Sequence, residues 1–288
     1  MPKHAKDKFV RDESSSGRLQ IQPHDLTLLK DVAEYRLMNT EQIASLHHRG
    51  LRNLQRRLYK LFHAGYLSRP KQQETQLLFS GSMVYGIGAK AVEVLYAGAE
   101  RREKLAQIRI DEKTTLPHIS HTLMISRFRA LVSLAFGKEN DSSLVRWEDA
   151  HALKLLLAPR GGRAELVPDG FFTITTPRGK LGYFLEADRA SEWKGTFLEK
   201  MKTYREWYRT ESCREKIGIA KFQVLTITES AKRRDVLRKI TKQTDPKKEG
   251  SLIFLFATEH EFSLVRPESL FAPVWLSPKD EEKLTLIP

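Results

Sequence analysis

Apolar residues in the first hundred positions recur every three or four residues, which is the spacing of amphipathic helices. The stretch HDLTLLKDVAEYRL (24–37) predicts one helix, and EQIASL (41–46) predicts a shorter one that Thr40 can cap. The face of the first helix that we expect to be buried carries Leu26, Leu29, Val32 and Ala33. The N-terminal region is therefore predicted to begin as a small helical unit.

A third helix is predicted at LRNLQRRLYKLFHAGYL, which begins at residue 51 and ends near Gly65. Its buried stripe is predicted to be Leu51, Leu54, Leu58 and Leu61. The residues predicted to face outward are Arg52, Asn53, Arg56, Tyr59, Lys60 and His63. Two short strands (66–71 and 83–88) and a helix in 88–98 follow. Three helices followed by a two-stranded wing predict a winged helix-turn-helix over residues 21–97, a fold that binds DNA or proteins.

Charge strengthens the DNA interpretation of this region. The chain of 288 residues has a formal net charge of +13, which attracts polyanions. No acid lies between Glu41 and Glu74. We predict DNA contacts from residues in this interval, namely Arg49, Arg52, Asn53, Arg56, Arg57, Lys60, Arg69 and Lys71. A second basic stretch, 231–250, either follows phosphates or forms a solvated face.

The rest of the chain alternates between helical and strand patterns. Residues 1–20 are predicted to be a flexible basic arm and 98–117 a charged connection. A helix over 118–136 is followed by strands at 144–149, 165–174 and 180–188, a helix at 197–208, a strand at 221–228, a basic helix from 230 and a strand at 252–258. This order predicts an α/β domain over 118–288 with a mixed central sheet.

The hairpin ELVPDGFFTITTPRGKLGYFLEADRA (165–190) carries three acids. The two-residue period of a strand puts Glu186 and Asp188 on the same face as Phe184, and Asp169 lies on the preceding strand. Adjacent carboxylates repel, and a divalent cation with oxygen ligands would remove that cost. The spacing therefore predicts a Mg²⁺ or Mn²⁺ site at Asp169, Glu186 and Asp188. Exposed strand-end acids paired with Arg163 or Arg189 are the alternative.

Other polar groups give weaker indications. His118 and His121 lie one helical turn apart, but satisfied histidines are the simpler interpretation. Glu148 can reach the acids or form an exposed ion pair. Cys213 is the single cysteine, which excludes an internal disulfide and favours the cytoplasm. With no apolar run of about 18 residues and no signal-peptide pattern, we expect no membrane association.

The motifs together resemble a known family. PDG followed by FLEAD, between one helix and the helix FLEKMKTYREWY, resembles the Pro-Asp…(Asp/Glu)-x-Lys pattern of the restriction-nuclease-like superfamily. More narrowly, the chain resembles the replication-relaxation family of plasmids and other mobile elements. The matching stretches are 24–97, HTLMISRFRALV (121–132), VPDGFFTI (167–174) and YFLEADRASEWKGTFLEKMKTYREWY (183–208).

The resemblance implies a winged helix joined to a restriction-endonuclease-like domain, with Asp169 and Glu186 as its two metal-binding acids. Some relatives act as relaxases in plasmid mobilisation, and others are replication or regulatory proteins. The superfamily pattern expects a lysine two residues after the glutamate, but this chain has Asp188 there. A lysine on the next helix can replace it. The candidates are Lys194, Lys200 and Lys202, of which Lys200 best fits the family's Lys-x3-Tyr with Tyr204.

These features favour a protein that binds double-stranded DNA and carries a metal-dependent nicking site. In this hypothesis Asp169, Glu186, Asp188 and Lys200 are the catalytic residues. The alternative is a transcriptional or replication regulator whose inactive nuclease fold serves for homodimerisation. Asp188 at the lysine position favours the regulator, whereas Glu186 within YFLEA favours the enzyme. A protein-binding adaptor is a third interpretation, but it does not explain the basic third helix.

Overall fold

The computed structural model describes residues 9–12, 19–74, 82–111, 113–137, 143–159, 162–189, 193–219 and 221–287. The chain divides into two compact units, Met1–Ala130 and Leu131–Pro288. Among the described residues, the strands form a three-stranded sheet in the first unit and a seven-stranded sheet in the second. This combination of helices with a mixed seven-stranded sheet and a small antiparallel sheet confirms the predicted α/β class. Within the described residues, every helix is too short or too polar to span a lipid bilayer.

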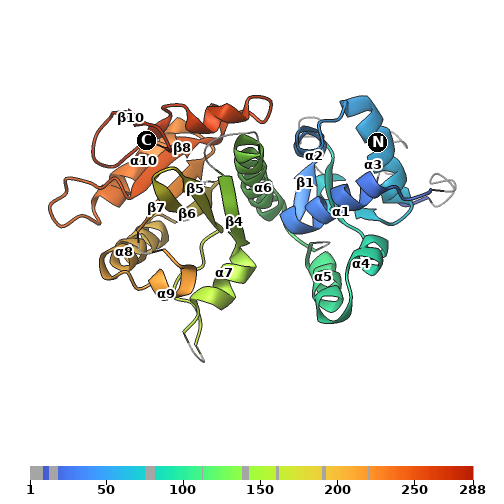
Figure 1. Cartoon of the computed structure of the whole chain (residues 1–288), viewed down its shortest axis with the longest axis horizontal. Helices are drawn as coiled ribbons and strands as arrows, with labels where there is room; N and C mark the ends of the chain where they lie inside the picture. The colour runs from blue at the N-terminus through green and yellow to red at the C-terminus, as the bar shows by residue number, and fades with distance from the viewer. Residues whose placement is uncertain are drawn as a thin grey trace. The chain divides into compact units, whose positions relative to one another are not determined.

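The first unit packs helices against a small antiparallel sheet with strand order β1-β3-β2 (Figure 1). Its elements are α1 (Pro23–Tyr35), β1 (Leu37–Asn39), α2 (Thr40–Leu46), α3 (Leu51–His63), β2 (Leu67–Ser68), the 3-10 helix η3 (Lys71–Glu74), β3 (Val84–Ile87), α4 (Ala89–Leu95), α5 (Gly98–Asp111) and the first part of α6 (Leu116–Phe136). Leu37 and Val84 on the sheet pack with Ile119 and Leu123 of α6.

Several local predictions for this unit need correction. Strand β1 was not predicted, because three residues are too few to show an alternating pattern. The cap of α2 is Asn39, whose side chain accepts a hydrogen bond from the Gln42 amide at 2.9 Å, whereas Thr40 is the first helical residue. Leu51 at the start of α3 is 49% exposed, so the buried stripe begins one turn later at Leu54.

His63 was predicted to face outward but is buried. Its Nδ1 accepts a hydrogen bond of 2.9 Å from the amide of Asp12, which requires that nitrogen to be unprotonated. Burial, helped by the charge of Arg69, lowers the pKa of His63 and favours this neutral form. The nearby Arg11 guanidinium donates to the Leu67 carbonyl at 3.2 Å. Residues 9–12 of the predicted flexible arm are therefore attached to the end of α3 and to β2. Residues 1–8 and 13–18 of the arm lie outside the described residues.

The predicted connection 98–117 contains the helix α5, which packs against α4. Its last residue, Asp111, is buried and accepts hydrogen bonds from Arg36 Nε and Gln107 Nε2, both at 2.9 Å. These bonds fix the C-terminal end of α5 to the residue that follows α1. The division between the two units lies further along the chain, within α6.

The second unit is built on a mixed sheet with strand order β10-β9-β8-β7-β6-β5-β4. Strands β4, β5 and β6 are antiparallel neighbours, whereas β6, β7 and β8 run parallel through helical crossovers. Its further elements are β4 (Ser143–Asp149), α7 (Ala150–Leu157), β5 (Gly170–Thr176), β6 (Gly179–Asp188), α8 (Lys194–Thr210), α9 (Arg214–Ile217), β7 (Phe222–Thr228), α10 (Ala231–Lys242), β8 (Phe254–Thr258), η4 (Glu259–Glu261), η5 (Pro267–Phe271), β9 (Trp275–Leu276) and β10 (Lys283–Leu284).

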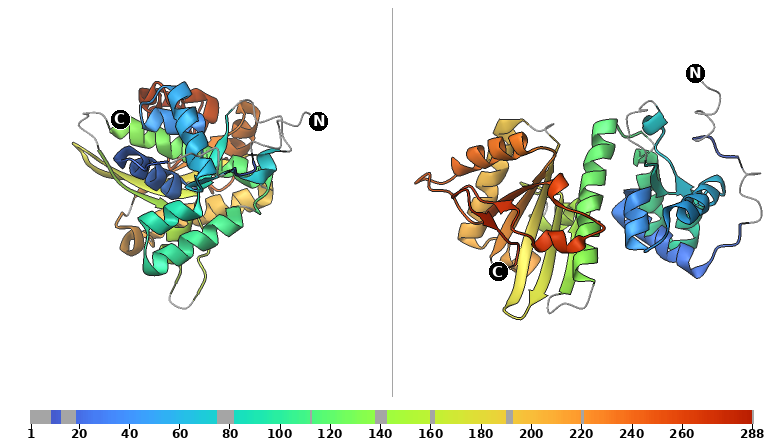
Figure 2. Two further views of the ribbon diagram at one scale, coloured as in Figure 1. Left: turned by 90° about the vertical axis from the view of Figure 1, so that its right-hand side faces the viewer. Right: turned by 90° about the horizontal axis from the view of Figure 1, so that it is seen from above.

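Both crossover helices, α8 and α10, lie on the same face of this sheet (Figure 2). The core beneath them contains Phe184 of β6, Phe197 and Met201 of α8, Leu237 of α10 and Phe254 of β8. The strand order and helix positions match the predicted hairpin followed by parallel crossovers. Helix α7 and the strands β9 and β10 were not predicted. The Asp149 side chain caps α7 by accepting from the Ala152 amide at 2.9 Å.

One buried ion pair connects α3 to α1 in the first unit. Asp25 is fully buried, and its carboxylate accepts hydrogen bonds from Arg57 Nε at 2.8 Å and from the Gln22 amide at 2.8 Å. Burial alone raises the pKa of Asp25, but the Arg57 and Gln22 hydrogen bonds outweigh it and hold the net pKa below its ordinary value. Asp25 and Arg57 are therefore both charged in the folded unit, and their ion pair connects α1 to α3.

We expect Arg57→Ala to lower the free energy of unfolding of the first unit by about 2 to 4 kcal/mol, because it leaves a buried carboxylate without its cation. Urea denaturation followed by circular dichroism measures this change. Arg56→Ala, one position earlier and exposed, is the control and should change stability by less than about 0.5 kcal/mol. Equal effects of the two substitutions would show that the Asp25–Arg57 pair has no such structural role.

Candidate functional site

Strand β6 and the residue before β5 bring two of the predicted acids together. Asp169 directly precedes β5, and its amide donates to the Leu185 carbonyl of β6 at 3.1 Å. The Asp169 side chain turns back onto the same strand, where Oδ2 accepts from the Ala187 amide at 2.8 Å. Asp169 is thus fixed beside Glu186, close enough for its charge to raise the pKa of Glu186.

Glu186 is buried under α8, which supplies two hydrogen-bond donors to its carboxylate. Lys200 Nζ lies 3.0 Å from Oε2, and the Tyr204 hydroxyl donates to Oε1 at 2.6 Å. The Glu186 residue is only 3% exposed, whereas the Lys200 side chain is 26% exposed. Because Lys200 and Tyr204 are four residues apart, they lie one turn apart on the same side of α8. Of the three candidate lysines, Lys200 is the one for which the structure shows a contact with Glu186.

The electrostatics of this cluster are governed by burial. Burial raises the pKa of Glu186 to about 7, and the charge of Asp169 acts in the same direction, while Lys200 and Tyr204 oppose the shift. Burial, together with the Glu186 charge, also raises the pKa of Tyr204 well above its ordinary value. Tyr204 therefore remains protonated and acts as a donor. The ring of Tyr204 packs in the core, and its hydroxyl fixes the Glu186 carboxylate.

Asp188 has a different partner. Its two carboxylate oxygens accept from Arg233 of α10, with Nε to Oδ1 at 2.7 Å and NH2 to Oδ2 at 2.8 Å. Both side chains are largely buried. Sequence reasoning did not identify Arg233, since nothing in the pattern of a basic helix singles out one inward arginine. Of the two arginines expected near the acids, Arg189 instead lies 3.5 Å from the carboxylates of Glu229 and Glu259.

The structure therefore does not bring all three acids around one point. Across the described parts of the chain, no three His, Cys, Asp or Glu side chains are grouped as ligands of a metal ion. Glu148 forms an ion pair of 2.6 Å with Arg146 on its own strand. The rings of His118 and His121 lie 6.4 Å apart on α6. Asp169 and Glu186 are the pair of acids that shares one site with a lysine.

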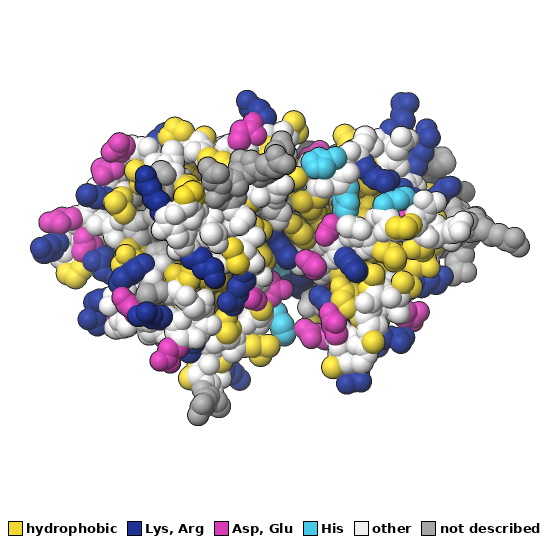
Figure 3. Space-filling model, viewed as in Figure 1, with side chains coloured by type: hydrophobic (Ala, Val, Ile, Leu, Met, Phe, Trp, Pro, Cys, Tyr) yellow, Lys and Arg dark blue, Asp and Glu magenta, His cyan; other side chains and the backbone are white. Residues whose placement is uncertain are grey.

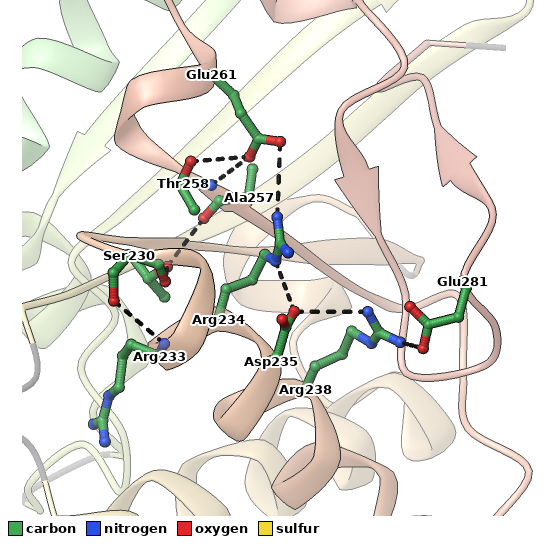
Figure 4. A network of polar contacts seen from close by, with 10 residues as sticks. Ser230, Arg233, Arg234, Asp235, Arg238, Ala257, Thr258, Glu261 and Glu281 are labelled. Carbon is green, nitrogen blue, oxygen red and sulfur yellow. Dashed lines mark hydrogen bonds and ion pairs between the residues drawn. The ribbon is translucent and has the colours of Figure 1, made fainter.

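The second basic stretch has its arginines engaged within the fold. Figure 4 shows Arg234 and Arg238 of α10 directed into a network of acids, while the Arg233 side chain points away from it toward its own partner. Arg234 pairs with Asp235 at 2.9 Å and Glu261 at 3.7 Å, and Arg238 pairs with Glu281. The exposed cations that remain in 231–250 are the lysines Lys232, Lys239, Lys247 and Lys248.

The predicted DNA-contacting residues fall into two groups. Two of them are used inside the unit. Arg57 donates a hydrogen bond to Asp25. Arg69 is buried, with its guanidinium 4.1 Å from the centre of the Phe62 ring and 3.3 Å from the Tyr85 hydroxyl. The other side chains are exposed and form no ion pair with a described residue; they are Arg49, Arg52, Asn53, Arg56, Lys60 and Lys71. Figure 3 shows Lys and Arg side chains gathered over the region of α3.

Comparison with known proteins supports the resemblance seen in the sequence. The replication-relaxation family profile matches residues 29–221, which is more than half of the chain. The chain belongs to the replication-relaxation family. The match includes the three-helix region, Asp169, Glu186, Lys200 and Tyr204, and it connects the protein to replication or to the biology of mobile elements. No curated protein and no solved structure matches the chain.

The raised pKa of Glu186 predicts a pH-dependent stability. Between its ordinary value of 4.5 and the folded value of about 7, the folded state binds more protons than the unfolded chain. The contribution is therefore fully present below about pH 4.5 and is lost as the pH rises through about 7. We expect the free energy of unfolding of Glu186→Gln to depend less on pH across this window than that of the wild type.

Urea denaturation at several pH values, with a chelator present, measures this difference. Glu199→Gln changes an exposed acid on α8, the helix that covers Glu186, and should retain the wild-type pH dependence. A Glu186→Gln profile parallel to that of the wild type would show that Glu186 titrates in the folded protein as it does in the unfolded chain.

Proposed function

We propose that this protein binds duplex DNA through α3. The observation that supports the proposal most strongly is that one arginine of this helix pairs within the fold, whereas other cations of the helix are exposed. Arg57 is used inside the unit, whereas Arg52, Arg56 and Lys60 are exposed on a helix that carries no acid. Exposed cations without protein partners are suited to DNA phosphates and to the acceptor edges of guanine.

The surrounding elements suit the same role. Helix α3 follows the short helix α2, and the antiparallel strands β2 and β3 come after it, in the order of a winged helix-turn-helix. In that arrangement α3 enters the major groove and the outward residues contact bases or backbone. Arg49 before α3 and Lys71 after β2 extend the positive charge on either side in sequence.

We expect the double variant Arg52→Ala/Arg56→Ala to bind duplex DNA about 10-fold or more weakly at about 0.15 M salt. The slope of log affinity against log salt should fall by about 2, since two phosphate contacts are lost. Fluorescence anisotropy across a salt series measures both quantities.

The matched control is Arg102→Ala/Arg109→Ala, which removes two exposed arginines from α5 and changes the net charge equally. A loss of affinity of the same size in both double variants would indicate a general charge effect and would contradict docking through α3.

A second candidate function is the nicking of DNA by the second unit. The observation that favours it is the contact of 3.0 Å between Lys200 Nζ and Glu186, beside Asp169. Two acids and one lysine are the side chains that the nuclease-like pattern requires, although here the lysine comes from α8 rather than from β6. The cation of Lys200 is placed to orient and polarise an attacking water.

Asp169 and Glu186 suit a divalent cation such as Mg²⁺ or Mn²⁺. Mg²⁺ is commonly held by one or two carboxylates with water at its other positions, so the third acid is not required. Such an ion would lower the pKa of a bound water and offset the charge of a phosphodiester transition state. Asp188 is left out of this set, because it forms a two-point ion pair with Arg233 on a different helix from Lys200.

Calorimetric titration with Mn²⁺ tests this assignment. We expect Asp169→Asn and Glu186→Gln to abolish the binding heat, because each removes one carboxylate ligand. Asp188→Asn should retain it, because Asp188 serves Arg233 instead. Loss of binding in Asp188→Asn as well as in the other two variants would favour the three-acid arrangement expected from the sequence.

A regulator without enzymatic activity is the competing proposal, because Asp188 stands where the nuclease-like pattern has its lysine. In that case the Glu186 cluster serves only to fix α8 on β6. Absence of Mn²⁺ binding in the wild type, together with intact DNA binding through α3, would select the regulator.

A further inference from the structure

An aromatic side chain at the start of α8 is largely exposed to solvent. Trp193 is the N-cap residue of α8 and is 79% exposed, although tryptophan is usually well buried. Its indole has no hydrogen bond, ring contact or ion pair with any described residue. A large exposed apolar side chain without a packing role indicates a binding contact.

The position of the indole is fixed locally by a glycine. A Cβ atom added at Gly195 would lie 2.7 Å and 2.9 Å from the Cζ3 and Cε3 atoms of the Trp193 ring. The ring therefore rests against the backbone of the first turn of α8, and only a residue without a side chain at 195 permits this. One face of the indole is covered by Gly195, and the rest of the ring is open to solvent.

The described residues that follow Trp193 in the first turn of α8 are small, polar or cationic, and one acid, Glu192, precedes it in the sequence. Lys194 is exposed without a described ion-pair partner, Thr196 is exposed, and the first turn of α8 contains no acid. Protein-docking patches have an apolar, fully desolvated centre, which this surface lacks. A single aromatic platform beside cations is the arrangement that proteins use to stack nucleobases while attracting the phosphates.

We propose that Trp193 stacks on an unpaired nucleobase of a DNA strand that enters the Asp169–Glu186–Lys200 site. The inference rests on the nicking function proposed above and specifies its substrate as single-stranded or locally unpaired DNA. A base within an intact duplex offers no free face to Trp193, since both of its faces are stacked.

The spacing along α8 fits this role. Trp193 precedes the first turn of α8 and Lys200 is seven residues further along, so the two residues are about 10 Å apart along the helix axis. An unpaired strand needs only a few nucleotides to span this distance. A base stacked on Trp193 therefore positions the phosphates that follow it near Lys200 and Glu186. Trp193 is in this sense a positioning residue.

The test measures binding of the full-length protein to a thymidine homopolymer and to a duplex by anisotropy. We expect Trp193→Ala to lower the affinity for the single strand about 5- to 100-fold, which is the range for loss of one stacked base, and to leave the affinity for the duplex unchanged. Trp193→Phe should retain most of the affinity, and Gly195→Ala should lower it by displacing the indole while keeping it in the chain.

Intrinsic fluorescence provides a second readout. The chain has four tryptophans. The single strand should quench the emission of the wild type but not that of Trp193→Phe, which retains Trp147, Trp207 and Trp275. The control Leu155→Ala removes another exposed apolar side chain of the second unit and should bind the single strand like the wild type.

Equal single-strand affinity in Trp193→Ala and the wild type would overturn the proposal, as would an equal loss for single strand and duplex. A loss of the same size in Leu155→Ala would also overturn it, because the effect would not be specific to the indole. These outcomes are distinct from failure of the proposed functions. Duplex binding that ignores Arg52 and Arg56 would refute docking through α3, and absence of Mn²⁺ binding would refute nicking, whatever Trp193 does.

Discussion

The second unit depends on how the fold accommodates the Glu186 carboxylate. A charged group buried at the end of a strand is costly unless donors surround it. Here Lys200 and Tyr204, one turn apart on α8, supply a cation and a hydroxyl, and they connect the crossover helix to the strand that it follows. The carboxylate, the helix position and the neighbouring Asp169 thus form one arrangement, in which burial raises the pKa of Glu186 to about 7.

The chain has a net charge of +13, and several of its arginines form ion pairs within the fold. Arg57 and Arg233 each pair with a buried aspartate, and Arg234 and Arg238 connect α10 to acids in the C-terminal region. These side chains stabilise the fold and are not available to a ligand. The cations that remain exposed on α3 therefore carry more functional meaning than the total charge, and they are the basis for the proposed DNA contact.

Part of this arrangement could be predicted from the sequence because it depends on local periodicity. The two-residue period of β6 placed Glu186 on the same face as Phe184, and the spacing of Lys200 and Tyr204 placed both on one side of α8. The Asp188–Arg233 pair, the burial of His63 and the short strand β1 could not be predicted. Each depends on contacts between distant parts of the chain, which single-sequence patterns do not encode.

The claim that Lys200 replaces the lysine missing at position 188 is tested most directly by incubating supercoiled plasmid with Mn²⁺ and the protein. The account predicts relaxed circles with the wild type and with Lys202→Ala, whose lysine pairs with the exposed Glu199, and none with Lys200→Ala. Circular dichroism would verify that the variants are folded. Relaxation by Lys200→Ala at the wild-type rate would contradict the account. No relaxed product from the wild type, even on a plasmid that carries the cognate origin, would identify the protein as a regulator with an inactive nuclease fold.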